Sequence, residues 1–132
     1  MKSPEFRFYY FTSLYDETVA FYRDTLQFEI YRTWHRGDTD RGTIFHSPNR
    51  CGLIEIEWGE HAPSIRGGFY LEVTGLERWY ERVQQSGAPL RKELSATSYG
   101  HRNFKTVDPN GVEVSFFEYL KDPESGNSTF TE

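Results

Sequence analysis

The chain has 132 residues, a formal net charge of −5 and a hydrophobic fraction of 36%. Its pI is about 5.4, and it has neither a basic stripe nor an apolar run of about 20 residues, which excludes a nucleic-acid partner and a membrane-spanning helix. The N-terminal stretch MKSPEFRFYY lacks the apolar core of a secretion signal, and the lone Cys51 cannot form an internal disulfide. We therefore expect a cytoplasmic protein, with a ring-rich core because aromatic residues make up 17% of the chain.

The first half of the chain predicts one strand, one helix and three further strands. The aromatic run at 6–11 favours a strand, and residues 16–26 repeat apolar side chains at helical spacing. Segments 28–34, 43–47 and 53–58 have strand composition, and polar loops at 35–42 and 48–52 separate them.

The second half repeats this order. Strands are predicted at 69–73, 89–94, 99–107 and 112–119, with a helix at 74–87 and a turn, DPNG, at 108–111. Phe8 matches Phe69 and Tyr22 matches Tyr80 in the repeat. We therefore predict an α+β fold of two tandem βαβββ modules, at about 5–60 and 66–120, within a single domain at 1–122. The polar segment 123–132 is predicted to be a flexible tail.

Strand alternation places a set of polar and aromatic residues on one face of the predicted sheets. Rings among carboxylates favour a ligand-binding cleft over a simple solvent-facing surface. The residues of this face are Arg7, Tyr9, Phe11, Glu55, Glu57, Tyr70, Glu72, Glu113, Ser115 and Phe117.

Two stretches, AFYRDTLQF at 20–28 and YGHRNFKTVDPNGVEVSFFE at 99–118, resemble the vicinal oxygen chelate superfamily. That superfamily contains glyoxalases, bleomycin-resistance proteins and extradiol dioxygenases, and the resemblance covers roughly residues 5–120. It implies two βαβββ modules that form curved mixed sheets around a cleft, and pairing of modules within or between chains, so that a homodimer is expected. Because the fold supports several chemistries, the resemblance does not fix the activity.

In the metalloenzymes of this superfamily, four side chains of the cleft hold a divalent ion. The resemblance places these four positions at Arg7, Glu55, Gly68 and Ser115. Only Glu55 is a plausible ligand, and the permanent charge of Arg7 would repel an ion. We therefore predict no metal and no cofactor, with Arg7 paired to Glu55 in place of the ion.

Further candidates come from the ends of strands. His101 follows the Tyr-Gly pair that opens a strand, where it could donate a hydrogen bond to a ligand. Trp34 could stack on a flat ligand or cover the edge of the core. The predicted ligand-binding residues are Arg7, Tyr9, Trp34, Glu55, Tyr70, His101, Ser115 and Phe117.

Three functions remain open from the sequence. The first is a metal-free protein that binds a small organic molecule, cationic or aromatic, in the sheet cleft. The second is a lyase or isomerase of the glyoxalase type, in which Glu55 acts as the base and Arg7 stabilises a developing oxyanion, with or without a divalent metal. The third is a module that binds a protein partner and has no small-molecule function.

Overall fold

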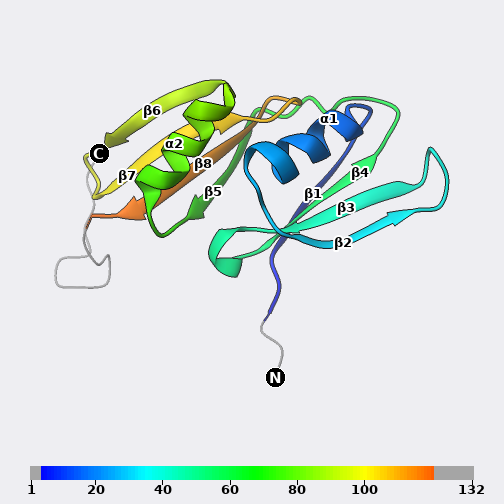
Figure 1. Cartoon of the computed structure of the whole chain (residues 1–132), viewed down its shortest axis with the longest axis horizontal. Helices are drawn as coiled ribbons and strands as arrows, with labels where there is room; N and C mark the ends of the chain where they lie inside the picture. The colour runs from blue at the N-terminus through cyan, green and yellow to red at the C-terminus, as the bar shows by residue number, and fades with distance from the viewer. Residues whose placement is uncertain (1–3, 121–132) are drawn as a thin grey trace.

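The computed structural model describes residues 4–120 and contains two βαβββ modules (Figure 1). This confirms the predicted fold. The elements of module one are β1 (Arg7–Thr12), α1 (Tyr15–Ala20), η1 (Phe21–Thr25), β2 (Ile30–His35), β3 (Arg41–His46), η2 (Pro48–Arg50) and β4 (Leu53–Trp58). Those of module two are β5 (Gly67–Glu72), α2 (Leu76–Ser86), β6 (Leu90–Ala96), β7 (His101–Val107) and β8 (Val112–Tyr119).

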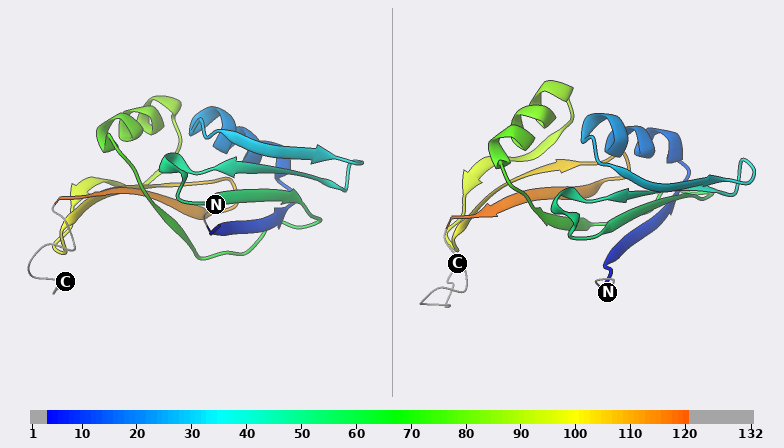
Figure 2. Two further views of the ribbon diagram at one scale, coloured as in Figure 1. Left: turned by 90° about the horizontal axis from the view of Figure 1, so that it is seen from below. Right: turned by 60° about the horizontal axis from the view of Figure 1, so that its bottom comes forward.

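Each module forms one mixed four-stranded sheet. The strand order is β1-β4-β3-β2 in the first sheet and β5-β8-β7-β6 in the second. In both modules the first strand pairs in parallel with the last, and the remaining pairs are antiparallel. The helices of both modules lie on the same side of the two sheets (Figure 2). The opposite side of each sheet is therefore free of helices.

The sequence located the last strands of both modules more accurately than the first strands. Strands β4 and β8 match the predicted ranges, whereas β1 begins one residue later and β5 two residues earlier than predicted. The predicted tail at 123–132 lies outside the described residues. No helix within residues 4–120 is long and apolar enough to cross a membrane.

The helix of module one changes its winding halfway. Residues Tyr15–Ala20 are α-helical, and Phe21–Thr25 form a π turn in which the Leu26 amide donates to the Phe21 carbonyl at 3.0 Å. A π turn inserts one extra residue and so shifts which side chains face inward. Here Phe21, Tyr22 and Leu26 are all buried, and Tyr22 is completely inaccessible to solvent.

Rings from both modules meet in one hydrophobic core. Phe8 of β1 packs against Phe69 of β5, with ring centroids 5.1 Å apart. Phe28 of module one packs against both Trp79 and Phe116 of module two, with ring centroids 5.9 and 6.2 Å apart. Because large rings bury much apolar area, this core offsets the low hydrophobic fraction of the chain.

The DPNG turn connects the two modules. Asp108 is 3% exposed, and its Oδ2 atom accepts hydrogen bonds from the hydroxyls of Tyr10 and Tyr22, both in module one. Its Oδ1 atom accepts from the backbone amides of Asn110 and Val112, at 2.8 and 3.1 Å. The turn was predicted as a connection between two strands, and the structure adds a second role in holding the modules together.

Asn110 extends the same connection. Its side-chain amide donates to the Thr18 hydroxyl at 2.9 Å, and its oxygen accepts from the Thr12 hydroxyl at 2.5 Å. Burial, together with the negative charge of Asp108, raises the pKa of the Tyr10 phenol, so Tyr10 stays a hydrogen-bond donor at physiological pH.

Replacing Asp108 should destabilise both modules. Asp108→Asn keeps the shape of the side chain but removes the charge that two phenols and two amides share. We expect it to lower the free energy of unfolding by about 3 kcal/mol, measured by urea denaturation. Asp38→Asn, at a side chain that is 99% exposed, is the matched control and should change stability by less than about 0.5 kcal/mol. Equal stability of the two variants would contradict the role assigned to Asp108.

Candidate functional site

Each sheet presents one face away from its helix, which we call its open face. On module one, the strand register aligns the side chains of this face in three rows. The rows are Arg7, Leu53 and His46; Tyr9, Glu55, Ile44 and Arg32; and Phe11, Glu57, Gly42 and Trp34. All of the predicted site residues of module one therefore lie on a single face, as strand alternation had indicated.

Arg7 and Glu55 form an ion pair on this face. The Nη1 atom of Arg7 donates to Glu55 Oε1 at 2.5 Å, and a second nitrogen of Arg7 lies 2.7 Å from Glu5. The Glu55 side chain is only 12% exposed, so solvent screens this pair less than an ordinary surface pair. Its hydrogen bond to Glu55, and secondarily the bond to Glu5, raises the pKa of Arg7, which therefore holds its charge firmly.

Glu57 lies next to Glu55 on the same face of β4. Burial, followed by a hydrogen bond to Glu55 and repulsion from its charge, raises the pKa of Glu57 to about 7. Two neighbouring carboxyls share a proton when they cannot both ionise. Arg7 neutralises Glu55, whereas Glu57 has no basic partner among residues 4–120. Among the described residues, Glu57 is therefore the acid of this face that lacks a basic partner.

Trp34 lies flat across β3. A Cβ atom at Gly42 would lie 2.2 Å from an atom of the Trp34 ring, so the absence of a side chain at Gly42 makes room for the indole. Gly42 pairs with both Trp34 and Glu57, so the indole and the carboxyl occupy neighbouring positions of one row. The Trp34 indole N–H donates to Asp40 at 3.3 Å. On the far side of Glu57, the Phe11 side chain is half exposed.

The open face of module two is equivalent in position but different in chemistry. Tyr70 pairs with Ser115 as Tyr9 pairs with Glu55, and Gly68 occupies the place of Arg7. The rows of this face are Gly68, Glu113 and Val107; Tyr70, Ser115, Lys105 and Lys92; Glu72, Phe117, Asn103 and Ser95; and Tyr119 and His101.

Two of the predicted residues of module two are buried. Ser115 is 1% exposed, and His101, expected near the mouth of the cleft, is 8% exposed. His101 packs against Tyr99 and Phe117, with ring centroids 4.5 and 5.0 Å apart. Burial lowers the pKa of His101, so its ring is neutral at physiological pH. Tyr70 remains half exposed, and its ring centroid lies 5.9 Å from that of Phe117.

The sequence did not single out three polar residues of this face, Lys92, Asn103 and Lys105. The alternation of β7 carries the signal for two of them, because His101, Asn103 and Lys105 share a face at two-residue steps. Arg102 points to the other side, where it pairs with Glu77 and Glu118. Arg102 is therefore a structural cation.

The four positions implied by the resemblance do not fit a divalent ion. Glu55, the one possible ligand, is already paired with Arg7. A Cβ atom at Gly68 would lie 1.7 Å from the Glu113 carbonyl oxygen, so a ligating side chain has no room there. Ser115 is a neutral hydroxyl, which is a weak donor for such an ion. No group of three His, Cys, Asp or Glu side chains suited to a metal is found within residues 4–120.

Within the chain, the candidates of the two modules form two separate clusters. Arg7, Glu55 and Tyr9 belong to the first, and Tyr70, His101 and Phe117 to the second. A hollow of about 140 Å³ at the module boundary is lined by Phe8, Phe69 and Tyr70, among other residues. Of the predicted ligand-binding residues, it contains only Tyr70.

Comparison with known proteins identifies the fold. The family model of the Glyoxalase/Bleomycin resistance protein/Dioxygenase superfamily matches residues 7–116. TnmS3, described as an antibiotic binding protein from Streptomyces sp. CB03234, has a TM-score of 0.73 and 18% identity, covering 89% of this chain and 97% of that one. TioX from Micromonospora sp. ML1 has a TM-score of 0.73 and 14% identity, and the match covers 89% of this chain and 100% of TioX. No match is found among curated proteins.

The Glu55–Glu57 pair predicts a carboxyl that titrates near neutrality. Carbon-detected NMR should show the Glu57 carboxyl changing at about pH 7, and Glu55→Gln should move this midpoint downward by removing the adjacent charge. Between pH 4.5 and 7 the folded state keeps a proton that the unfolded state has lost, so this group lowers stability as pH rises through that window. Glu57→Gln should flatten that decline, while Glu60→Gln, at an exposed position, should not. A midpoint at the ordinary value would show that the two carboxyls do not interact.

Proposed function

The chain belongs to the Glyoxalase/Bleomycin resistance protein/Dioxygenase superfamily, and on this premise we propose that it is a metal-free protein that binds a small, flat organic cation. The ligand lies on the open face of module one. The observation that carries this proposal is the row formed by Phe11, Glu57 and Trp34. In this row an acid that has no basic partner in the described part of the chain stands between two rings.

The chemistry of this row suits a cation. A positive group over an aromatic face gains about 0.5–2 kcal/mol from the ring quadrupole, and a neighbouring carboxylate adds a direct charge pair. Glu55 is held by Arg7, so the incoming cation would pair with Glu57. Trp34 offers a broad ring next to that carboxyl because Gly42 leaves room for it.

Arg7 supports the metal-free part of the proposal. A fixed cation bound to Glu55 provides the positive charge that an ion would otherwise place on this face. TnmS3, which shares the fold, is described as an antibiotic binding protein. A drug-like ligand is therefore compatible with this architecture.

We further propose that the protein works as a homodimer. Several aromatic rings of the open faces are exposed in the single chain: Tyr9 is 59%, Phe11 50%, Tyr70 49% and Tyr119 41% exposed. Exposed rings in such numbers are typical of an interaction surface. A second copy would cover the rings of module one, Tyr9 and Phe11, and close the ligand site, and sedimentation equilibrium measures this association directly.

Binding of a planar cation is the test of the proposed function. We expect 9-aminoacridine to bind and to quench Trp34 fluorescence, and the neutral analogue acridone to bind more weakly. Glu57→Gln should weaken binding of the cation by roughly tenfold, the effect of losing about 1.4 kcal/mol. Because the cation favours the ionised acid, affinity should rise as pH increases through about 7.

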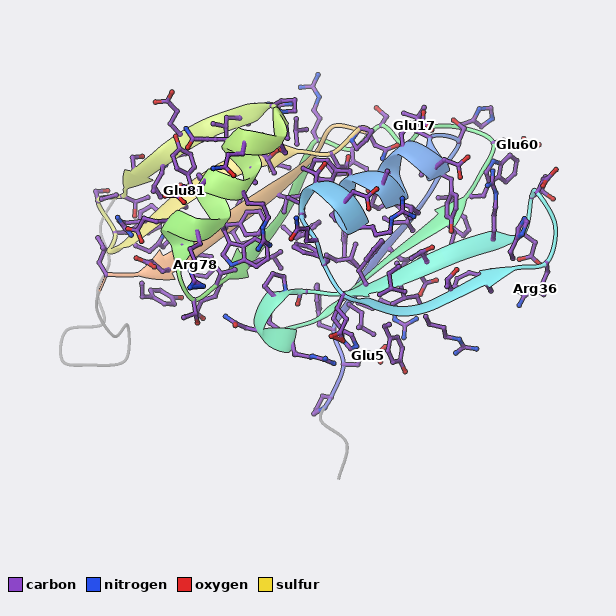
Figure 3. All side chains as sticks on the ribbon, in the orientation of Figure 1. Glu5, Glu17, Arg36, Glu60, Arg78 and Glu81 are labelled. Carbon is purple, nitrogen blue, oxygen red and sulfur yellow. The ribbon has the colours of Figure 1, made fainter. Side chains whose placement is uncertain are left out.

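The matched control is Glu60→Gln, which removes a carboxylate at the exposed end of the module, beyond β4 (Figure 3). It should leave affinity for the cation unchanged. Equal binding of 9-aminoacridine and acridone, with no effect of Glu57→Gln, would exclude the proposed site.

One observation favours an enzyme as a second candidate. Next to Glu55, the Glu57 carboxyl has a pKa raised to about 7, close to the value that a general acid or base needs. In a lyase or isomerase, Glu55 would take a proton from the substrate and Arg7 would stabilise the resulting oxyanion. Glu55→Gln should then abolish turnover while the unfolding midpoint stays unchanged, and full activity in this variant would rule the mechanism out.

A further inference from the structure

Two buried polar atoms on the open face of module two have no hydrogen-bond partner within residues 4–120. They are Nδ1 of His101 and Oδ1 of Asn103, in side chains 8% and 1% exposed. Leaving a buried polar atom unpaired destabilises the folded state, so each such atom in a folded protein calls for an explanation. The two residues are separated by one position on β7 and share a face. A ligand that pairs with both would remove this cost.

The surroundings of these atoms are aromatic. Phe117 pairs with Asn103 across the strands and lies 5.0 Å from the His101 ring. The ring centroids of Tyr70 and Tyr99 lie 6.4 and 4.5 Å from that of the same imidazole. Tyr70 is half exposed, so part of this aromatic surface is available to a flat molecule.

The charge of the surroundings is positive. Lys105 donates to the Tyr70 hydroxyl at 3.0 Å and lies 3.8 Å from Glu113, which Arg91 also contacts at 3.4 Å. Lys92 donates to the Ser95 hydroxyl at 2.7 Å and has no carboxylate partner among residues 4–120. Burial, together with the charge of Lys105, lowers the pKa of Lys92. Lys92, Lys105 and Arg91 thus outnumber the two carboxylates of this face, Glu113 and Glu72, so the local charge favours an anion.

We propose that the open face of module two binds a planar hydroxyaryl acid, meaning an aromatic ring that carries a carboxylate beside a hydroxyl group. The carboxylate would pair with Lys92 and accept a hydrogen bond from His101 Nδ1, and the hydroxyl would donate to Asn103 Oδ1. The ring would pack against Phe117 and Tyr70. Entry to the buried atoms requires the flexible Lys92 side chain or the Phe117 ring to swing aside.

This site is distinct from the one proposed on module one. Its residues belong to β5, β6, β7 and β8, and its charge is opposite to that of the row around Glu57. The two sites therefore select ligands of opposite charge, and either can be tested without the other.

Calorimetric titration with 3-hydroxy-2-naphthoate tests the proposal. The acid should bind the full chain, and its neutral methyl ester should bind at least tenfold more weakly. Lys92→Gln should reduce affinity for the acid by roughly tenfold without changing affinity for the ester, and Lys92→Arg should restore most of the affinity. The imidazole NMR signals of His101 should shift when the acid binds, which a purely non-specific electrostatic effect would not produce.

Arg78→Gln is the matched control. It removes one positive charge from helix α2, which lies on the opposite side of the sheet (Figure 3), and should leave affinity for the acid unchanged. Equal binding of acid and ester, no effect of Lys92→Gln, or no binding of the acid at all would overturn the proposal. If 9-aminoacridine binds while the acid does not, only the module-two site fails; the reverse result removes only the function proposed for module one.

Discussion

The arrangement of the two modules depends on one buried carboxylate. Asp108 belongs to module two, yet two of its four hydrogen-bond donors are phenols of module one. Its charge is balanced by neutral donors alone among the residues described, so every one of these bonds matters for keeping it buried. The π turn in the first helix serves the same interaction, because it accompanies the burial of Tyr22 with its hydroxyl 2.9 Å from Asp108.

Because Asp108 and the shared rings fix the modules side by side with their helices on one side, both open faces remain available. Gene-duplicated modules would begin with equivalent faces, and the register shows which positions correspond. Tyr9 and Tyr70 still occupy the same place, whereas Arg7 corresponds to Gly68 and Glu55 to Ser115. The rings have been retained and the charges have changed. One face is acidic around Glu57 and the other basic around Lys92, so the fold presents two open faces of different local charge.

The sequence predicted the modules and their faces because both follow from local periodicity. Strand alternation assigned Arg7, Tyr9 and Glu55 to a common face, and the register agrees. It could not predict how deeply each side chain of a face is buried. Neither the burial of Ser115 nor that of His101 follows from period-two patterning alone. The bridging role of Asp108 was also out of reach, since turn chemistry explains Asp-Pro-Asn-Gly completely without any contact to another module. The raised pKa of Glu57 requires knowing which neighbours bury it.

Both the backbone and the side chains determine why the four positions implied by the resemblance do not fit a divalent ion. Arg7 could in principle be replaced by a ligand, because it projects from an ordinary strand position and is one-third exposed. Gly68 is different, since β5 runs so close to β8 that any Cβ would collide with the Glu113 backbone. Restoring a four-ligand site would therefore require separating the two strands, and that would disturb the parallel pairing that positions Tyr70 over Ser115. The strand spacing of module two therefore leaves no room for a ligating side chain at position 68, whereas in module one the possible ligand Glu55 is engaged by an ion pair with Arg7.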